Sequence, residues 1–417
     1  MQQTLRPYQR AGVQQLLALV AKHGSAILAD EPGLGKTIQV AEYMNRTTPD
    51  NVLIVCPASL RINWGKELDK WLNRDAVAFV CIRSYEQITA DDYPDVTFDL
   101  VVFDEAHYLK NPDAKRTKAC LALEARSRLF LTGTPIVNRP MDIFPILKSM
   151  GAKWNRTEFG KRYCDGKLIT VRWKPKKKLA WDFSGASRQD ELNAALRKHC
   201  MVRRTKAEVL TELPAKTRQV IELDIPDVET PALKTAVARM FEGMEQAAAN
   251  LGELKQIAFT ELAAARLDTA RAKLPSVIEC INTTLEEEEK VVVFAYHREI
   301  IDDICEAFAD DAVKLYGGMS DKQKNEAVEA FQHGDARVFV GQITAAGTGI
   351  TLTKASTVIF AELDWVPGNV TQAEDRCHRL GQQDTVRVIH LAARSSVDAR
   401  MINALVDKQN NIDAITR

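Results

Sequence analysis

The feature of this sequence that most limits its possible folds is a recurrence of short, uninterrupted apolar runs. They form two groups and are bounded by turn residues or helix-period segments, at 26–28, 52–56, 100–103, 129–131, 291–296, 338–340, 358–360 and 386–391. Runs that are apolar at every position predict strands buried on both faces, as in parallel sheets covered by helices. The sequence therefore predicts an α/β protein with two such sheets.

The long interval between the two groups has a different character. Residues 148–218 hold 19 Lys and Arg against 7 Asp and Glu, a net +12, although the whole chain has 56 of each kind and is formally neutral. From about 230 to 275 the pattern becomes helical and rich in alanine, and 217–227 looks like an extended connector. The neutral total thus conceals one strongly basic region, so a partner as anionic as nucleic acid is not excluded.

These patterns predict four parts, with the boundaries 1–147 for a first lobe, 148–216 for its basic helical protrusion, 217–272 for a connector and helical protrusion of the second lobe, and 273–417 for the second lobe. We expect an intracellular chain with no membrane partner, because we find neither a signal peptide nor a run of about 18 uncharged apolar residues. The eight cysteines include no C-x-x-C pair, which predicts reduced thiols and no structural zinc.

The first candidate site is ADEPGLGKT at 29–37, between the first apolar run and a helical stretch. Gly33 and Gly35 allow backbone N–H groups to approach phosphate oxygens at a helix N-terminus, and Lys36 brings positive charge to the β- and γ-phosphates. Thr37 would place a hydroxyl on Mg²⁺. The strict phosphate-loop pattern fails only at its first position, where Asp30 stands in place of glycine.

Polar residues also follow three other apolar runs. The run at 100–103 leads into DEAH at 104–107, where Asp104 can hold Mg²⁺ through water and Glu105 can deprotonate the attacking water. Phosphoryl transfer requires mainly positioning and charge neutralisation, which a lysine loop and an acidic pair supply. The other two runs are followed by Pro57 with Ser59 and by TGTP at 132–135, and open α/β sheets bind ligands at the carboxyl ends of their strands.

The second half of the chain has no lysine loop of its own and instead ends in QAEDRCHRLGQ at 372–382. If this segment is helical, it presents Gln372, Arg376 and Arg379 on one face. Arginines supplied from a second lobe can stabilise charge that develops on a γ-phosphate. The alternative interpretation is a basic surface helix whose arginines pair with Glu374 and Asp375.

In their order along the chain, these motifs resemble those of the Swi/Snf-family ATPases of helicase superfamily 2. The resemblance runs from residue 5 to about 398 and rests on LRPYQ (5–9), DEPGLGKT (30–37), LIVCPASL (53–60), DEAH (104–107), LTGTP (131–135), RRTKAEVLTELPAK (203–216), VVVFAYH (291–297), ITAAGTGITLT (343–353), ELDWVPG (362–368) and QAEDRCHRLGQ (372–382). In that family the first loop usually begins with Asp, which accounts for Asp30, and usually has Met at the position of Pro32. The chain looks most like the annealing-helicase and fork-remodelling (HepA-related) branch, reduced to a minimal motor core.

The resemblance implies two RecA-like lobes of the P-loop NTPase type with helical protrusions between them, and ATP with Mg²⁺ in the cleft. The residues that it assigns to ATP and Mg²⁺ are Arg6, Gln9, Asp30, Gly33, Leu34, Gly35, Lys36, Thr37 and Asp104, with Glu105 as the base and Gln372, Arg376 and Arg379 completing the site. The residues that it assigns to the DNA backbone are Pro57, Ala58, Ser59, Thr132, Gly133, Thr344, Ala345, Ala346, Gly347 and Trp365. A buried core position is the alternative for Trp365.

The resulting expectation is a DNA-dependent ATPase that moves along double-stranded or branched DNA without regard to sequence and remodels or anneals forks. Three alternatives are a strand-separating helicase, an ATP-driven remodeller of DNA-bound proteins, and a nucleotide-gated DNA-binding scaffold without turnover. We expect a monomer, because one chain supplies both halves of the ATP site, and a possible recruiting protein is not identified. The compact motor suggests the cytoplasm or nucleoid of a bacterial cell, or a virus-infected host.

Overall fold

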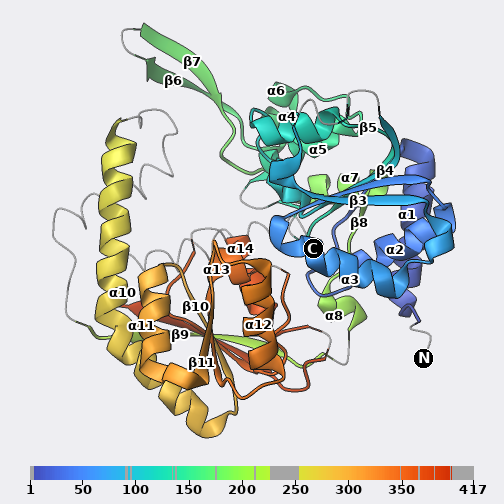
Figure 1. The fold of residues 1–417 in the computed structure, drawn as a ribbon. Coiled ribbons are helices and arrows are strands. Elements are labelled where there is room, and N and C mark those ends of the chain that lie inside the picture. Colours follow the sequence, from blue (N-terminus) through green and yellow to red (C-terminus); the bar gives the residue numbers. More distant parts are fainter. Residues whose placement is uncertain are drawn as a thin grey trace. The chain divides into compact units, whose positions relative to one another are not determined.

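The computed structural model describes residues 4–89, 93, 96–133, 135–136, 139–173, 176–210, 213–225, 253–347, 349–364, 367–379, 381–394 and 396. These residues fall into two compact units (Figure 1). Of the described residues, the first unit contains those from 4 to 165 and from 185 to 210, and the second contains those from 166 to 184 and from 213 to 396.

The first unit is built on a six-stranded parallel sheet. Its strands lie in the order β3 (Phe79–Ser84), β2 (Asn51–Cys56), β4 (Thr97–Asp104), β5 (Glu124–Leu131), β1 (Ser25–Leu28) and β8 (Met201–Val202). The first three helices of the chain supply one of its cores, and they are α1 (Pro7–His23), α2 (Lys36–Thr47) and α3 (Arg61–Trp71). Two shorter helices, α4 (Lys115–Ala122) and α5 (Phe144–Ser149), complete the part of this unit that precedes residue 150.

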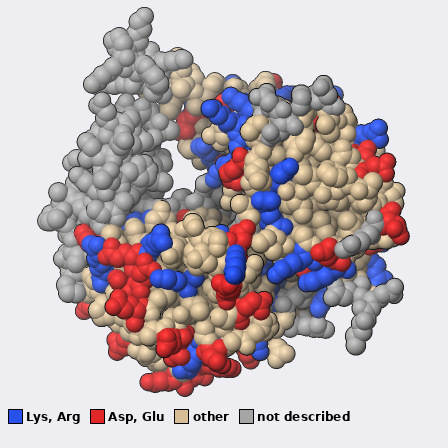
Figure 2. Space-filling view, viewed as in Figure 1, with Lys and Arg blue, Asp and Glu red and all other residues tan. Residues whose placement is uncertain are grey.

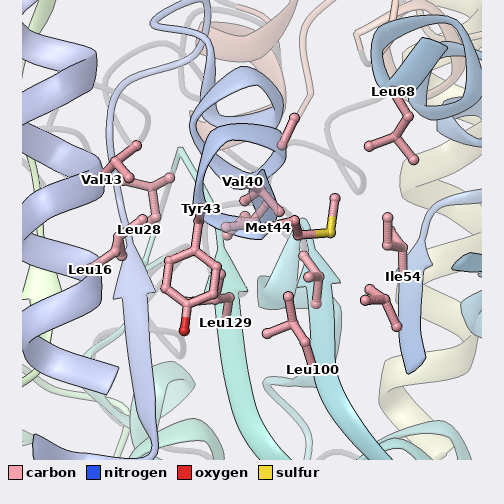
Figure 3. Close-up of a cluster of buried hydrophobic side chains, with 14 of the residues drawn as sticks. Val13, Leu16, Leu28, Val40, Tyr43, Met44, Ile54, Leu68, Leu100 and Leu129 are labelled. Carbon is pink, nitrogen blue, oxygen red and sulfur yellow. The ribbon is translucent and has the colours of Figure 1, made fainter. Parts of the chain in front are cut away.

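Both faces of this sheet are buried. On one face, Leu28, Ile54 and Leu129 pack against Val13 and Met44 of the helices (Figure 3). Alternate residues of the same strands point to the opposite face because strand side chains have a period of two, and Ile27, Val55, Val101 and Phe130 there are also fully buried. This double burial explains why the central strands are apolar at every position.

The second unit contains a second six-stranded parallel sheet. The order is β11 (Ala312–Leu315), β12 (Val338–Gln342), β10 (Val291–Ala295), β13 (Thr357–Phe360), β14 (Val386–Ala393) and β9 (Lys216–Leu223). The long helix α10 (Glu253–Glu287) and α11 (Arg298–Phe308) share one core with it. The other core involves α12 (Asp321–Gln332), α13 (Ile343–Ala346) and α14 (Pro367–Glu374).

All eight apolar runs are strands of these sheets, so the predicted α/β class with two parallel sheets is confirmed. The sequence missed the outer strands. Strands β3, β11 and β9 are less buried than the central strands, whereas β8 is buried but has only two residues. The segment predicted as a connector is one of them: β9 pairs in parallel with β14 over eight residues. Its exposed positions, such as Arg218 and Gln219, break the apolar pattern that marks the central strands.

The basic interval is only partly the helical protrusion that we predicted. It contains α6 (Arg156–Tyr163), α7 (Gln189–His199) and α8 (Lys206–Val209), but also strand β8 of the first sheet. Between α6 and α7, β6 (Lys167–Trp173) and β7 (Lys176–Asp182) form a two-stranded antiparallel ribbon. The β-branched and aromatic residues Ile169, Thr170, Val171 and Trp173 of β6 are residue types that favour strands.

All eight cysteines are free thiols, as predicted, and Cys56, Cys120, Cys164 and Cys377 are buried. None of the helices among the described residues is both long and apolar enough to cross a membrane.

Candidate active site

The polar motifs of the first unit meet at one edge of its sheet. Asp104 at the end of β4 lies beside Leu131 at the end of β5, which in turn lies beside Leu28 at the end of β1. All these strands run in parallel, so the segments that follow them emerge on the same side. The structure thus brings together the lysine loop, the acidic pair and the TGTP segment, as the sequence predicted.

The lysine loop joins β1 to the N-terminus of α2 and uses its glycines for their backbone freedom. Gly33 has a φ of 90° and Gly35 a φ of 76°, both in the left-handed region that disfavours other residues. A β-carbon on Gly35 would lie 2.5 Å from Gln9 Nε2. The buried Gln9 side chain donates to the Leu34 carbonyl over 3.3 Å, and Lys36 Nζ donates to the Asp30 carbonyl over 2.9 Å. The loop is therefore tied to α1 on one side and closed on itself.

The residues assigned to ATP differ widely in their exposure to solvent. Arg6 has an exposed side chain, and its backbone N–H donates to Gln9 Oε1 over 3.0 Å at the start of α1. Leu34 is fully buried, so its contribution to a nucleotide site is limited to its backbone. Thr37 is half-buried in the first turn of α2, next to Lys36.

Asp30 anchors the loop from within. Its carboxylate is fully buried and accepts hydrogen bonds from Gln39 Nε2 (2.9 Å) and from the backbone N and Nε of Arg204 (3.0 Å each). The Arg204 guanidinium also donates to Gln39 Oε1 over 2.7 Å and to the Tyr8 carbonyl. The side chain at the position where a glycine was expected thus serves as a buried ion-pair partner.

The chain around Arg204 runs alongside the loop as an extension of strand β8. Backbone N–H groups of Ile27, Ala29 and Glu31 donate in turn to the carbonyls of Cys200, Val202 and Arg204 over 2.7–3.1 Å. The neighbouring Arg203 donates to the carbonyls of Ala29 and Gly133, at 2.7 and 3.3 Å. Sequence reasoning noted RRTK at 203–206 as part of the basic interval and of a family motif. It did not anticipate that a buried acid at position 30 would need one of these arginines as its partner.

The acidic pair lies at the end of β4. Asp104 accepts from Trp64 Nε1 over 2.8 Å and from the backbone N–H of Glu105 over 2.9 Å. Burial raises the pKa of Asp104 to about 6, and the adjacent Glu105 carboxylate acts in the same direction, whereas the Trp64 hydrogen bond and the Lys36 charge oppose the rise. Glu105 has a left-handed φ of 51° and its Oε2 lies 3.2 Å from His107 Nδ1. Such backbone strain in a non-glycine residue is concentrated at functional sites.

These groups fit a magnesium ion of the kind that is held mainly by its nucleotide. Among the described residues, no cluster of three or more His, Cys, Asp or Glu side chains could hold a metal ion on its own. Mg²⁺ commonly takes only one or two protein carboxylates and completes its shell with phosphates and water. The Asp104 carboxylate and the Thr37 hydroxyl supply the hard oxygen donors that this requires.

The first unit also holds five of the residues assigned to DNA. Pro57 precedes a short 3₁₀ helix, Ala58–Leu60, which contains Ser59; Pro57 is buried and Ala58 is exposed. Thr132 is buried, and its N–H donates to the Leu28 carbonyl over 3.1 Å. A β-carbon on Gly133 would lie 2.7 Å from Pro32 Cγ, so the TGTP segment packs closely against the lysine loop.

In the second unit, the helix predicted over 372–382 is shorter than expected. Helix α14 ends at Glu374, and tighter bonds follow, with the N–H of Arg376 donating to the Ala373 carbonyl over 3.0 Å. Gln372 is therefore helical, whereas Arg376 and Arg379 lie in turns. The prediction of one helical face is wrong in form, yet both guanidinium groups converge, because each donates to the Ile350 carbonyl, at 3.3 and 3.0 Å.

The carboxylates beside these arginines are bound by strand β9. Glu374, which is buried, accepts from Lys216 Nζ over 2.9 Å and from Arg218 over 2.6 and 2.8 Å, and Lys216 also reaches Asp375 over 3.1 Å. Burial opposes the ionisation of Glu374, but the two cations outweigh it and lower its pKa to about 2. The structure thus disfavours the interpretation in which Glu374 serves the arginines of its own segment.

Four more of the residues assigned to DNA lie at the carboxyl end of β12. Thr344 is exposed and Ala345 half-buried in α13, whereas Ala346 and the C-cap Gly347 are buried. A β-carbon on Gly347 would lie 2.4 Å from the Ile343 carbonyl oxygen. Any contact made by Ala346 or Gly347 is therefore limited to the backbone. Trp365 lies outside the described residues.

A pair that sequence reasoning missed joins two motifs of the second unit. Glu362, after β13, accepts from His297 Nδ1 over 2.6 Å and from the backbone N–H groups of Tyr296 and His297 over 2.9 and 2.8 Å. Burial opposes ionisation of Glu362, but these donors prevail and lower its pKa. The carboxylate fixes the segment that follows β10, at the same sheet edge as α13.

Comparison with known families identifies this arrangement. A family model of the SNF2-related domain matches residues 8–90 and 76–267, and the helicase conserved C-terminal domain matches residues 272–381. The chain therefore belongs to the SNF2-related family of helicase-like ATPases. Among solved structures, the chain is similar to the Sulfolobus solfataricus SWI2/SNF2 ATPase core in complex with dsDNA, at 23% identity and a TM-score of 0.45, covering 100% of this chain and 94% of that one.

Individual relatives place the chain within the family. It is 34% identical to the SWI/SNF-related matrix-associated actin-dependent regulator of chromatin subfamily A-like protein 1 of Xenopus tropicalis, over 94% of this chain and 43% of that protein. It is 33% identical to the human DNA annealing helicase and endonuclease ZRANB3, over 95% of this chain and 39% of that protein. The resemblance to the annealing-helicase branch is thereby confirmed, and the chain spans about two fifths of these relatives.

The expected bacterial or viral setting is wrong. Relatives that are 32–34% identical to this chain over 94–99% of its length come from animals, including frog, human, Drosophila melanogaster and Caenorhabditis elegans. That expectation was based on the small size of the predicted motor. The length of a sequence does not indicate the kind of organism from which it comes.

Proposed function

We propose that this chain is a DNA-dependent ATPase that couples ATP hydrolysis to translocation along double-stranded DNA and remodels or anneals forked and branched DNA. The observation that supports it most is the edge of the first sheet, where the lysine loop and the acidic pair follow strands in register. Family membership supports the ATPase activity, and the names of the relatives support the action on DNA structures.

In this proposal, residues of the first unit hold ATP and Mg²⁺. The N–H groups of the loop around Gly33 and Gly35 and the charge of Lys36 would bind phosphate oxygens, while Thr37 and Asp104 would hold the metal. Bound Mg²⁺ neutralises phosphate charge. Glu105 would orient a water molecule and accept its proton, a role for which its neighbour His107 helps to set the carboxylate position.

Arginines of the second unit would complete catalysis. Arg376 and Arg379 converge on the Ile350 carbonyl, so the same short segment positions both guanidinium groups. A guanidinium that approaches the γ-phosphate stabilises charge there, which contributes on the order of 10³ to 10⁵ in rate. Binding and release of nucleotide would then alternate the engagement of these arginines, and movement along DNA would follow from that alternation.

DNA would be held through its backbone. The basic interval carries a net +12, and the sheet-edge segments at 57–59, 132–133 and 344–347 offer backbone N–H groups and small side chains. Phosphate contacts fix position without recognising bases, so binding would be independent of sequence and would weaken steeply with salt. One chain would suffice, as a monomer, because it carries both sets of ATP-site residues.

An ATPase assay with and without duplex DNA tests the proposal. We expect DNA to stimulate turnover, and we expect Lys36→Ala and Glu105→Gln to abolish it. Arg379→Ala should retain nucleotide binding and lose hydrolysis. Unchanged turnover in Glu105→Gln would refute the assigned base, and failure of Arg379→Ala to bind an ATP analogue would refute the role of that arginine. A chain that binds DNA in a nucleotide-dependent way without turnover would instead be a scaffold.

A further inference from the structure

The antiparallel ribbon β6–β7 is the element of this chain that the ATPase machinery leaves unexplained. Its two strands pair over seven residues each and join neither six-stranded sheet (Figure 1). A two-stranded ribbon without further strands is marginally stable in water, so its sequence is under little demand from packing. The residues that it exposes are therefore informative about what it binds.

One face of the ribbon exposes large apolar side chains. Leu168 pairs directly with Trp181, and Thr170 pairs with Leu179, so these four residues share one face. Leu168 is 52% exposed, Leu179 62% and Trp181 37%. Large apolar side chains that are exposed on a protein surface usually occur singly. Three of them in one patch therefore indicate an interaction site.

The aromatic ring in this patch is arranged for stacking. Trp181 and Phe183 lie parallel, with ring centroids 6.0 Å apart and an angle of 6° between their planes. A rigid aromatic pair at an exposed edge offers the kind of flat platform on which nucleic-acid bases stack. Each unpaired base has such a π-face, whereas the bases of an intact duplex are already stacked on one another.

The charge of the ribbon indicates an anionic partner. Residues 166–181 contain six Lys and Arg and no Asp or Glu. By contrast, Figure 2 shows acidic side chains gathered over α11 of the second unit. A wholly basic segment that also exposes stacked aromatic rings has the two features that single-stranded nucleic acid requires, because its backbone is anionic and its bases are unstacked.

We propose that the exposed face of β6–β7, with Trp181 at its centre, binds unpaired bases of DNA next to a duplex. Trp181 stacks on a base, Leu168 and Leu179 cover its edges, and the basic residues of the ribbon hold the adjoining phosphates. This inference rests on the proposed function and deepens it, because it makes the preferred substrate a junction with unpaired strands.

The test compares the full chain with Trp181→Ala on two fluorescent DNAs, a forked duplex with unpaired thymidine arms and a blunt duplex with the same base pairs. Loss of one stacked base predicts roughly tenfold weaker binding to the fork. Binding to the blunt duplex and the ATPase rate that it stimulates should not change. Trp181→Phe should restore most of the affinity for the fork.

Two further variants provide a second probe of this face and a control outside it. Leu179→Ser removes apolar surface from the same face without altering the Trp181–Phe183 stack, and it should also weaken fork binding selectively. Phe79→Ala removes an aromatic ring that is 58% exposed at the start of β3, and it should leave fork binding unchanged.

The inference is refuted if Trp181→Ala binds the fork as tightly as the unmodified chain does, or if it loses the same affinity for the fork and for the blunt duplex. It is also refuted if light scattering shows that Trp181→Ala changes the oligomeric state, because the face would then bind a second copy of the chain. If the unmodified chain shows no DNA-stimulated ATPase, the proposed function fails. If stimulation is present and only the selectivity of the ribbon is missing, this inference alone fails.

Discussion

Replacement of Arg204 by alanine tests whether the buried ion pair with Asp30 holds the lysine loop. The Asp30 carboxylate is fully buried and the Arg204 side chain is only 14% exposed. In Arg204→Ala, Asp30 keeps the Gln39 amide but loses its cation, and the Tyr8 carbonyl loses a donor. Breaking a buried pair by removing one partner costs roughly 3–5 kcal/mol. Because Gln39 remains, we expect about 3 kcal/mol, near the lower end of that range.

That free energy should be visible as a shift in melting temperature. For a unit of this size, each kcal/mol corresponds to roughly 2–4 °C, so the first unit should melt about 6–12 °C lower. Scanning calorimetry measures the shift, and hydrogen exchange of β1 and α2 shows whether the loss is local to the loop. We also expect weaker ATP binding, because Asp30 carries the carbonyl to which Lys36 is bonded.

The matched control is Arg46→Ala. Arg46 pairs with Glu42 over 2.7 Å on the outer side of α2, with side chains 35% and 25% exposed. A surface pair of this type contributes roughly 0.3–0.5 kcal/mol. If Arg204→Ala lowers the melting temperature no more than Arg46→Ala does, the ion pair does not hold the loop, and the reasoning from burial is refuted.

Two other predictions concern the second unit and the TGTP segment. The pKa of Glu374 is lowered to about 2, so its ion pairs stabilise the fold above pH 4.5, its ordinary pKa, and this stability is lost as the pH falls toward 2. Relative to Glu374→Gln, the free energy of unfolding of the unmodified chain should therefore rise by about 3 kcal/mol between pH 2 and pH 5 in urea titrations, and parallel curves would contradict this. Gly133→Ala places a β-carbon 2.7 Å from Pro32 and should cost roughly 1–3 kcal/mol and reduce ATPase turnover, whereas Gly65→Ala, where nothing lies within 4 Å, should cost neither.

The central strands could be predicted from sequence because burial on both faces demands apolar residues at every position. Val291 to Ala295 of β10 satisfy this demand completely. Edge strands do not need apolar residues at every position. Strand β9 exposes residues such as Arg218 and Gln219, and its sequence therefore resembled a connector. The ribbon β6–β7 was missed for a related reason: it belongs to neither six-stranded sheet, and its basic residues suggested part of a helical protrusion.

The candidate site was predictable where the motif itself carries the chemistry. Lys36 and the acidic pair lie where the sequence placed them, because parallel strands deliver their carboxyl ends to one edge. The pairings between distant segments were not predictable. Arg204 lies 174 positions from Asp30, and Lys216 lies 158 positions from Glu374. Because the partners are so far apart in the sequence, only the folded structure shows that each buried acid has a cation beside it.

The most direct test of the central claim is displacement of a third strand from a triplex on duplex DNA. The chain, ATP and the triplex are mixed, and release of the third strand is measured in parallel with an assay for strand separation on a tailed duplex. If the chain translocates on duplex DNA, it releases the third strand when ATP is present and leaves the tailed duplex paired. The Glu105→Gln variant should not release the third strand. Release of a single strand from the tailed duplex without triplex displacement would contradict translocation and favour a strand-separating helicase.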